Sequence, residues 1–559
     1  MPLMGSIYVG SSGLQTSSNA LNTAAHNLAN IETAGYTRQQ TLQGNKFYNT
    51  IGNAAISDMQ IGIGVDYTKC RQVRDEFLDA SYRKENGRSS FYEICAESTN
   101  EIETLLGEME GASFKDSLAK LWTSVQELQK DPSSSVTQGV FVSTCAQFLE
   151  RASAVSSGLN DYQDNLNSRV VGMVEEINTT TDRIFELNKL IQRSEIGVEE
   201  ANDYRDERNY LLDKLSSKIS IKTVENVDGG VEIYAEGSPL LIGSSVNHLE
   251  TKVMDNGFYD VTWGKLYDEQ PVYNFHLPVS SETNTDIGEL KALLIARGDH
   301  RANYSDLEKG ATADDAFKYY NYGTDGQNDV PVATSVVMNA QGQFDRLIHN
   351  IVTSINNIVT DNATKKSDTQ SVEVFQRLGS DRFEEGADGK YIQEKTDKSP
   401  TDVSTMYTIS NLKVNPDLLK QPTLNKFLKD DNSVDFDKAT KLMEVFAGTG
   451  KVRDLNKDTE TWVDAAWTLN PNVNSKLGYI SFYDNVVGSL ANSGSVYNSI
   501  VSSQQVTVAS LEDSRQQVLG VSSEEELQNI IKFQNAYNAS SRYINVINEM
   551  LEHIINNLQ

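Results

Sequence analysis

Apolar residues recur at steps of three or four over a long stretch in the first half of the chain. The stripe consists of Phe148, Ala152, Val155, Leu159, Tyr162, Leu166, Val170, Met173, Ile177, Thr180, Ile184, Leu187 and Ile191. This spacing places side chains on one face of an α-helix and is close to the seam of a coiled coil. The pattern therefore predicts one long helix through this segment.

A more regular stripe fills the C-terminal segment. It alternates steps of three and four along Ile530, Phe533, Tyr537, Ser540, Ile544, Ile547, Leu551, Ile554 and Leu558. A second stripe of Tyr543, Val546 and Met550 lies beside it. Two possible capping boxes, in which Ser522 is followed by Glu525 and Ser523 by Glu526, come just before the run and predict where the helix begins.

The N-terminal segment combines large and small residues. Ile7, Leu14, Leu21 and Leu28 lie seven apart, and mostly small residues follow three or four positions later. A helix of this kind packs closely on a neighbour but buries little alone, so its stability must come from a partner. We expect the two terminal helices to run antiparallel as one stalk. A bundle within one chain is the alternative, but seams at chain ends, which usually fray, favour assembly with further copies.

The middle of the chain has a different character. Eight of the ten prolines lie between residues 239 and 471, so we expect strands and turns in this part of the chain. Alternating residues around Asp228-Gly229-Gly230 predict a β-hairpin over 221–234, and strand character continues at 258–263 and 272–277. Helical patterns return at 287–297 and 344–359.

These patterns predict an α+β multidomain protein in which paired terminal helices form a coiled-coil-like stalk. The expected divisions are a discontinuous stalk (1–65 with 505–559), a discontinuous helical body (66–220 with 330–364 and 476–504), a β-rich middle region (221–329) and an inserted mixed domain (365–475).

Composition narrows the function. The 559 residues carry a formal net charge of −29, which argues against a general nucleic-acid binder and against docking on anionic lipid. No apolar run is long enough for a membrane span, and the first 30 residues lack the features of a Sec-type signal. The three cysteines, Cys70, Cys95 and Cys145, are too few for a disulfide framework.

Candidate chemistry is weak. The six histidines are widely separated, and no metal-ligand spacing or catalytic motif occurs. Gly448-Thr449-Gly450-Lys451 resembles the end of a P-loop, but Val445 replaces the first glycine and Val452 the Ser or Thr that would hold magnesium. A surface turn is the better interpretation. We expect no enzyme activity, no cofactor, no metal and no catalytic residue.

Two motifs at opposite ends of the chain carry a family resemblance. The N-terminal run Asn27-Leu28-Ala29-Asn30-Ile31-Glu32-Thr33-Ala34-Gly35-Tyr36 resembles the signature of the bacterial flagellar rod–hook axial family. The run Phe533-Gln534-Asn535-Ala536-Tyr537-Asn538-Ala539-Ser540-Ser541-Arg542 resembles the signature at the C-terminus of that family. Within the family, Gly35-Tyr36-Thr37-Arg38-Gln39, 288–294, 407–416 and 520–527 are most similar to the proteins of the first junction between hook and filament.

The resemblance implies a structural component of the flagellum that forms the junction zone by helical self-assembly. Its implied partners are further copies, the hook protein, the second hook–filament junction protein and the flagellar type III export apparatus. An export chaperone on the amphipathic C-terminal helix is plausible. The implied assembly residues are Leu14, Leu21, Asn27, Leu28, Asn30, Thr33, Gly35, Tyr36, Phe533, Gln534, Tyr537, Ile544, Ile547, Leu551, Ile554 and Leu558.

Two alternatives stay open. The chain could be another axial protein, such as a hook or distal-rod protein, and labelling along the whole hook would favour that class. Less favoured is a secreted adhesin or enzyme carried on axial helices. A concave pocket with convergent, perturbed titrating groups within 221–475 would support it.

The terminal seams lead to a first prediction. If the ends fold only when partners cover them, protease should rapidly cut the purified monomer before about residue 35 and beyond about residue 525. Limited proteolysis followed by mass spectrometry measures this. Equal protection of the ends and the middle would contradict assembly-coupled folding.

Overall fold

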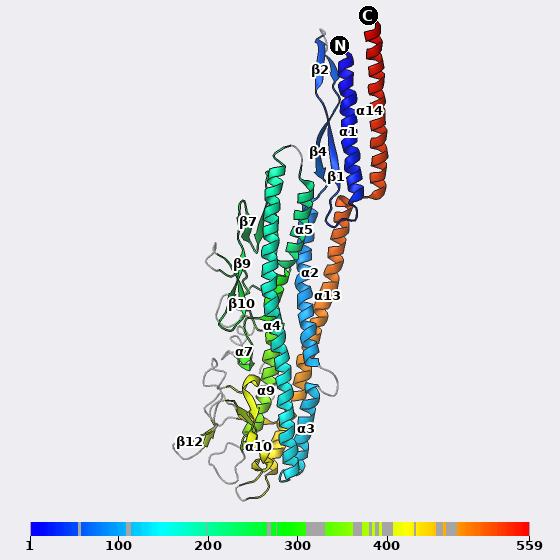
Figure 1. Ribbon diagram of the computed structural model, residues 1–559. Coiled ribbons are helices and arrows are strands. Elements are labelled where there is room, and N and C mark those ends of the chain that lie inside the picture. Colours follow the sequence, from blue (N-terminus) through cyan, green and yellow to red (C-terminus); the bar gives the residue numbers. More distant parts are fainter. Residues whose placement is uncertain are drawn as a thin grey trace.

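The protein is elongated, with a narrow stalk at one end of a helical body and small sheets along one side of that body (Figure 1). The structure, a computed structural model, describes residues 2–53, 58–107, 113–197, 200–264, 270–275, 277–308, 330–360, 372–378, 383–385, 391–393, 406–429, 432–453, 462–464 and 478–557. The predicted α+β multidomain class with paired terminal helices is confirmed.

Long helices that run along the molecule form the body. They are α2 (Glu76–Gly107), α3 (Phe114–Lys130), α4 (Ser135–Ser194), α5 (Asn202–Lys218), α9 (Val336–Thr360) and α13 (Tyr479–Leu519). Helix α13 packs along α2, while α4 contacts α3, α5 and the short helix α6 (Glu289–Arg297). Nearly every described side chain of α9 is buried, so this helix is the centre of the body.

The long helix predicted from the first stripe is confirmed as α4, which has 60 residues. The apolar positions Phe148, Ala152, Val155, Leu159, Leu166, Val170, Ile177, Ile184, Leu187 and Ile191 are all buried. Helix α9 begins at Val336, eight residues before the predicted start at Phe344.

Two asparagines of α4, the buried Asn188 and the half-buried Asn178, attach the strands to this helix. Asn188 donates Nδ2–H to the carbonyl of Val231 (2.9 Å) and accepts from its N–H (3.2 Å). Asn178 makes the same pair of bonds with Leu249 (2.8 and 3.0 Å). These asparagines lie ten residues apart, close to three helical turns, so both amides face one side of the helix. Each asparagine thus makes the two backbone hydrogen bonds that a neighbouring strand would otherwise make with that residue.

The predicted hairpin is confirmed: β5 (Ile221–Glu225) pairs with β6 (Val231–Ala235), and the sheet continues to β7 (Ser238–Ile242) and β8 (Ser245–Val246). Next to it, β9 (Leu249–Val253) pairs with β10 (Tyr259–Trp263), as expected for 258–263. The strand expected at 272–277 was wrong for the described residues there, which form no strand.

The remaining elements are short. They are α7 (Tyr304–Glu308), β11 (Phe375–Arg377), β12 (Phe383–Glu385), β13 (Tyr391–Gln393), the 3-10 turns η2 (Ile409–Asn411) and η3 (Pro422–Leu424), β14 (Leu412–Val414), α10 (Pro416–Lys420), α11 (Phe436–Phe446), β15 (Lys451–Arg453) and β16 (Trp462–Asp464). Much of the predicted mixed domain lies outside the described residues. The expected division at residue 505 falls inside α13.

The buried cysteines and the glycine-rich turn after α11, which were considered as reactive sites, lie in surroundings typical of structural residues. Burial raises the pKa of Cys95 to about 12 and that of Cys145 well above its usual value, because an apolar environment disfavours the thiolate. Gly448, with φ +77°, belongs to the turn that ends α11, where Gly450 N–H donates to the carbonyl of Glu444.

No helix in the described ranges is long and apolar enough to cross a membrane.

A buried ion network joins three helices of the body and yields a second prediction. Arg515 of α13 donates Nε–H to Asp79 of α2 (2.9 Å) and an Nη2–H to Asp213 of α5 (2.8 Å). Arg515→Met removes one partner from the buried carboxylate of Asp79 and one from the half-buried carboxylate of Asp213, so we expect the body to lose about 3 kcal/mol of its free energy of unfolding. Urea unfolding followed by circular dichroism measures this.

Arg301→Met is the matched control, because Arg301 pairs with Asp164 at an exposed site. It should cost no more than about 1 kcal/mol. Equal midpoints for the two variants would show that the buried network does not hold α13 on the body.

Candidate assembly surface

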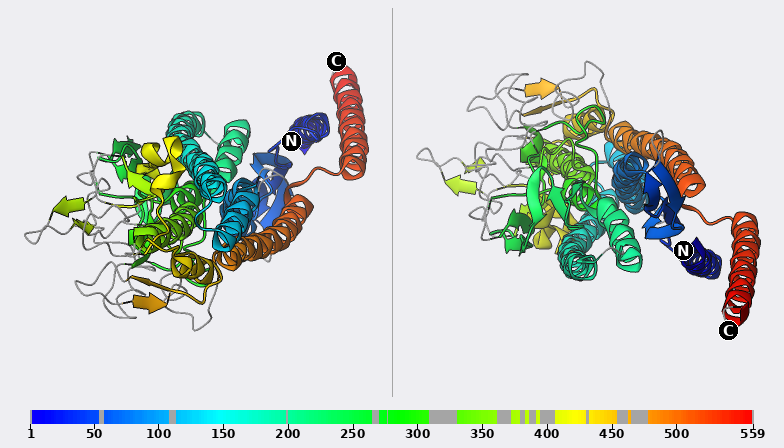
Figure 2. Two further views of the ribbon diagram at one scale, coloured as in Figure 1. Left: turned by 90° about the horizontal axis from the view of Figure 1, so that it is seen from below. Right: turned by 90° about the horizontal axis from the view of Figure 1, so that it is seen from above.

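The stalk consists of both chain ends and a long ribbon. Helices α1 (Pro2–Ala29) and α14 (Ser523–Asn557) pack together, and Figure 1 shows them antiparallel, with both termini at the far end. Strands β1 (Gln39–Asn45), β2 (Tyr48–Asn53), β3 (Asp58–Gly62) and β4 (Val65–Gln72) form a two-stranded ribbon, and β1 and β4 pack along α1. The stalk stands to one side of the body, away from the small sheets (Figure 2).

Glycines allow the two terminal helices to approach closely. A Cβ placed on Gly10 would lie 2.7 Å from Cγ1 of Ile544, and one on Gly13 would lie 2.9 Å from Oγ of Ser540. Both distances are shorter than real contacts, so larger side chains here would push the helices apart. The small residues of α1 therefore set the spacing of the stalk.

Helix α14 buries only part of its apolar surface. We call the side chains that lie toward α1 the inner seam: Phe533, Ser540, Ile544 and Leu551 are half-buried there and Ile547 is buried. Tyr537 and Ile554, from the same predicted stripe, are exposed, and Leu558 lies outside the described residues.

The rest of α14 carries large apolar side chains in water. We call this set the outer stripe: Leu527, Ile531, Tyr543, Val546, Met550 and Ile555. Ile531 is 59 % exposed and Met550 is 50 % exposed. The regular seven-residue spacing found Ile544, Ile547 and Leu551, but it missed Leu527, Ile531 and Ile555, which lie off that stripe.

The N-terminal signature builds the bend between stalk and body, which we call the elbow (residues 30–38 and 519–526). Asn27 of α1 donates Nδ2–H to the carbonyl of Gln39 (2.9 Å) and accepts from the Gln39 N–H (3.0 Å). Its Oδ1 also accepts from the Tyr36 hydroxyl (2.8 Å). Asn27 is buried, so these bonds fix the return of the chain from α1 into β1.

The other signature residues complete this turn. Asn30 donates to the carbonyl of His26 (3.0 Å) and accepts from the hydroxyl of Thr33 (3.2 Å). Gly35 has φ +80°, and a Cβ there would lie 3.1 Å from Tyr210 of α5. A left-handed backbone and this close approach together require glycine. These residues shape the elbow, where Thr33 and Gly35 are exposed and Asn30 is half-buried.

Leu14, Leu21 and Leu28 are half-buried along α1. Gln534 is exposed on α14. The predicted assembly residues thus fall into two groups: those of the elbow, and those along the α1–α14 pair.

An ion pair closes the elbow on its C-terminal side. Arg38 donates Nε–H to Glu526 (2.9 Å), its Nη1 lies 3.2 Å from Glu525, and its backbone N–H donates to the carbonyl of Leu519. Glu526 is only 2 % exposed. Ser522 Oγ accepts from the Glu525 N–H (3.5 Å), which places the start of α14 at the first predicted capping box. No local pattern predicts the pairing of Glu526 with Arg38, because the two residues lie 488 positions apart.

One buried carboxylate lies under the elbow. Asp206 of α5 accepts from Gln72 of β4 (2.7 Å) and contacts Thr37. Burial raises its pKa to about 6, although the hydrogen bonds from Thr37 oppose the shift. Folding therefore favours the protonated acid relative to the unfolded chain.

Perturbed groups also occur in the β-rich region. Burial raises the pKa of Glu236 to about 7, although nearby Lys291 lowers it, and burial lowers the pKa of Lys291. Tyr273 lies beside them. These residues line none of the three described cavities, whose walls come from other elements. They are an internal charge cluster without a described opening for a substrate.

Comparison with known families matches three parts of the chain. A profile described as the helical domain of flagellar hook-associated protein FlgK matches residues 99–371. The profile for flagella basal body rod proteins matches residues 7–37, and that for the C-terminal part of flagellar basal body rod FlgEFG proteins matches residues 515–558. The two terminal matches cover the elbow and the stalk helices.

Curated relatives cover nearly the whole chain. Flagellar hook-associated protein 1 of Bacillus subtilis is 26 % identical over 547 residues, which span 96 % of this chain and 95 % of the relative. The protein of the same name from Salmonella typhimurium is 25 % identical and covers 98 % of both chains. The solved flagellar hook junction protein FlgK from Burkholderia pseudomallei shares the fold, with a TM-score of 0.51 at 12 % identity over 79 % of this chain and all of that chain.

The third prediction concerns Asp206. Because its folded-state pKa lies above the unfolded value near 3.8, its contribution to stability is present below about pH 4 and is lost as pH rises through about 6. Asp206→Asn should remove this loss and add on the order of 2 kcal/mol at pH 7.5 relative to pH 4. Thermal melts at the two pH values measure the difference.

The control is Asp161→Asn, the same substitution at an exposed position of α4. It should leave the pH dependence unchanged. If the stability of the Asp206→Asn variant still falls with rising pH as in the wild type, another group causes that pH dependence.

Proposed function

The chain belongs to the flagellar hook-associated protein 1 family, and from that premise we propose that its stalk forms the inner, self-assembling part of the zone between hook and filament. The family is structural, and the chain is an axial component of the flagellum at the hook–filament junction. Which surfaces assemble, and with which neighbours, is the subject of the proposal.

The outer stripe of α14 is the main observation that supports assembly through the stalk. Six large apolar side chains of one helix face water, although the helix already has a partner in α1. Covering each such side chain contributes roughly 1–2 kcal/mol, so a set of six strongly favours a further neighbour. The stalk stands clear of the body (Figure 2), and these side chains are exposed to water.

The two sets of apolar side chains on α14 have different tasks in this proposal. The inner seam holds α14 on α1 within one subunit, and the outer stripe packs on the stalk of the next. Two unlike surfaces that meet head to tail produce a helical array when the rotation does not close, which is the geometry of an axial structure. The elbow keeps the stalk at a fixed orientation to the body, so that every subunit presents both surfaces alike.

The proposed partners follow from this place in the flagellum. The stalks would contact further copies, the hook protein on one side and the second hook–filament junction protein on the other. The chain would leave the cell through the flagellar type III apparatus and remain outside it. An export chaperone could cover the outer stripe before assembly. We propose a purely structural role without catalysis or a cofactor.

The fourth prediction tests the outer stripe. The pair Val546→Asp with Met550→Asp places two charges at exposed positions where a neighbour would pack, and no residue of α1 is changed. We expect the purified protein to keep its melting temperature but cells carrying it to lose nearly all filaments, with bare hooks and flagellin in the medium. Electron microscopy and immunoblotting measure both.

Asn538→Asp with Asn545→Asp is the matched control, because it adds the same charge at exposed polar positions of the same helix. Normal filaments are expected there. Normal filaments in the Val546–Met550 pair would remove the outer stripe from the assembly.

A further inference from the structure

Part of α13 lacks charged residues altogether. The 27 residues from Asn485 to Leu511 contain no Asp, Glu, Lys or Arg, although such residues make up 23 % of the chain. At that frequency about six would be expected in such a length. The run is flanked by Asp484 and Glu512, so the charge-free part is confined to the middle of the helix.

This run is not buried. Its inner positions pack on α2, where a Cβ on Gly494 would lie 3.3 Å from Thr99. Its outward positions, which include Ser495, Ser499 and Ser502, are exposed, and Val506 is 70 % exposed. An exposed helix face in a soluble acidic protein normally carries charges, so this one has a different requirement.

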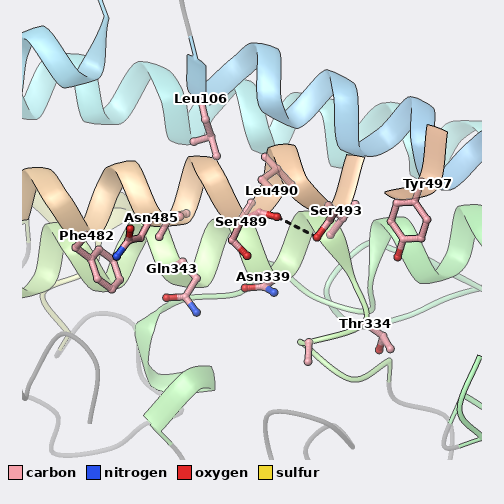
Figure 3. Close-up of a pocket in the computed structure, with 14 residues that line it drawn as sticks. Leu106, Thr334, Asn339, Gln343, Phe482, Asn485, Ser489, Leu490, Ser493 and Tyr497 are labelled. Atoms are coloured by element: carbon pink, nitrogen blue, oxygen red, sulfur yellow. Dashed lines mark hydrogen bonds between the residues drawn. The ribbon is translucent and has the colours of Figure 1, made fainter. Parts of the chain in front are cut away.

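A groove lies beside this face. Helix α13 and α9 enclose a cavity of about 340 Å³ whose lining has no charged residue. Figure 3 shows Leu106 and Phe482 among its apolar side chains, with Gln343 of α9 and Asn485 of α13 beside them. These two amides make no hydrogen bond among the described residues, so they can bind polar groups of a partner.

We propose that the charge-free face of α13 (Asn485–Leu511), together with this groove, is a second contact between neighbouring subunits, docking on the body of another copy of this chain. This proposal rests on the proposed function and adds a body contact to the stalk contact.

Charge selects a second copy as the occupant. Every copy carries a net charge of −29, and residues 1–75 and 520–559 hold only seven of its 49 basic and nine of its 78 acidic residues. The body therefore carries almost all the excess negative charge, and neighbouring bodies repel one another. Burying unpaired charges is costly, so neighbouring acidic bodies meet at the least cost where a face has none. The middle of α13 is such a face, with Glu93 and Glu103 of α2 along its inner edge.

The size of the face fits a contact that forms only in an array. A helix of 27 residues is about 40 Å long and about 10 Å wide, so it covers on the order of 400 Å². A stable independent complex buries about 800 Å² on each partner. The face is therefore too small to hold two free copies together, and it acts once the stalks have brought the bodies side by side.

The first experiment identifies the occupant. A photoreactive amino acid replaces Ser499 in the full chain, in cells that carry this as their only copy, and isolated flagella are irradiated. We expect a product of twice the 62.0 kDa chain mass that contains only this protein, and none from dilute purified monomer. A product with a different protein, or none from flagella, would overturn the proposal.

The second experiment tests the role of charge. Ser495→Glu with Ser502→Glu should leave the melting temperature unchanged, because both positions are exposed, but reduce the fraction of filament-bearing cells at least tenfold. Ser495→Gln with Ser502→Gln adds the same bulk without charge and should retain filaments. Asn165→Glu with Thr179→Glu, at exposed positions of α4, controls for added charge elsewhere.

The outcomes separate the two proposals. If the glutamate pair on α13 behaves like the glutamine pair while Val546→Asp with Met550→Asp abolishes filaments, the α13 contact is wrong and the stalk function stands. If the α4 pair is as harmful as the α13 pair, the effect is general repulsion and the α13 contact is wrong. If neither the stalk pair nor the α13 pair has an effect, both proposals fail.

Discussion

Helix α14 cannot cover its apolar surface within its own chain, and the rest of the architecture follows from that constraint. Among the residues that the structure describes, its one large partner is α1. This helix has no Asp, Glu, Lys or Arg, and its glycines accept the inner seam at close range. A second helix of the same chain could have covered the outer stripe, but the long C-terminal helix α13 packs on the body instead. The unmet burial therefore stands at the end of the molecule, where it is open to other chains.

A stalk with exposed apolar side chains can build a regular array only if its orientation relative to the body is the same in every copy. The elbow supplies this through buried polar contacts and not through apolar packing. Asn27 bonds both backbone groups of Gln39, as a neighbouring strand would. Arg38 neutralises Glu526, which is almost fully buried. Buried polar groups of this kind tolerate few alternative arrangements, because each alternative leaves a donor or a charge without a partner. The same device fixes the sheets, where Asn178 and Asn188 bind strand edges.

Periodicity made some of this predictable. The stripes identified α4 and the inner seam, because a helix that buries one face repeats at 3.6 residues. It could not place the start of α9, since the polar residues Asn339, Gln341 and Gln343 interrupt the apolar pattern of its first two turns. It also misjudged 272–277 as strand, where local alternation had no neighbouring strand to pair with along its length.

The candidate surface shows the same limit. The signature around Asn27 pointed to the correct segment, but its role in the elbow depends on Gln39, Tyr210 and the start of α14, which no local pattern connects. Ile531 and Leu527 were missed because exposure is not a sequence property: a helix with two apolar stripes reads the same whether one is covered or neither.

The uneven distribution of charge reconciles solubility with assembly. A chain that is sticky at both ends must stay apart from its copies until it reaches the growing structure, and the acidic body provides that repulsion over about a Debye length of 8–10 Å. The same repulsion would oppose the proposed array. A stalk with little net charge and one face of α13 without charged residues would let copies make contact there, while the acidic bodies keep free molecules apart.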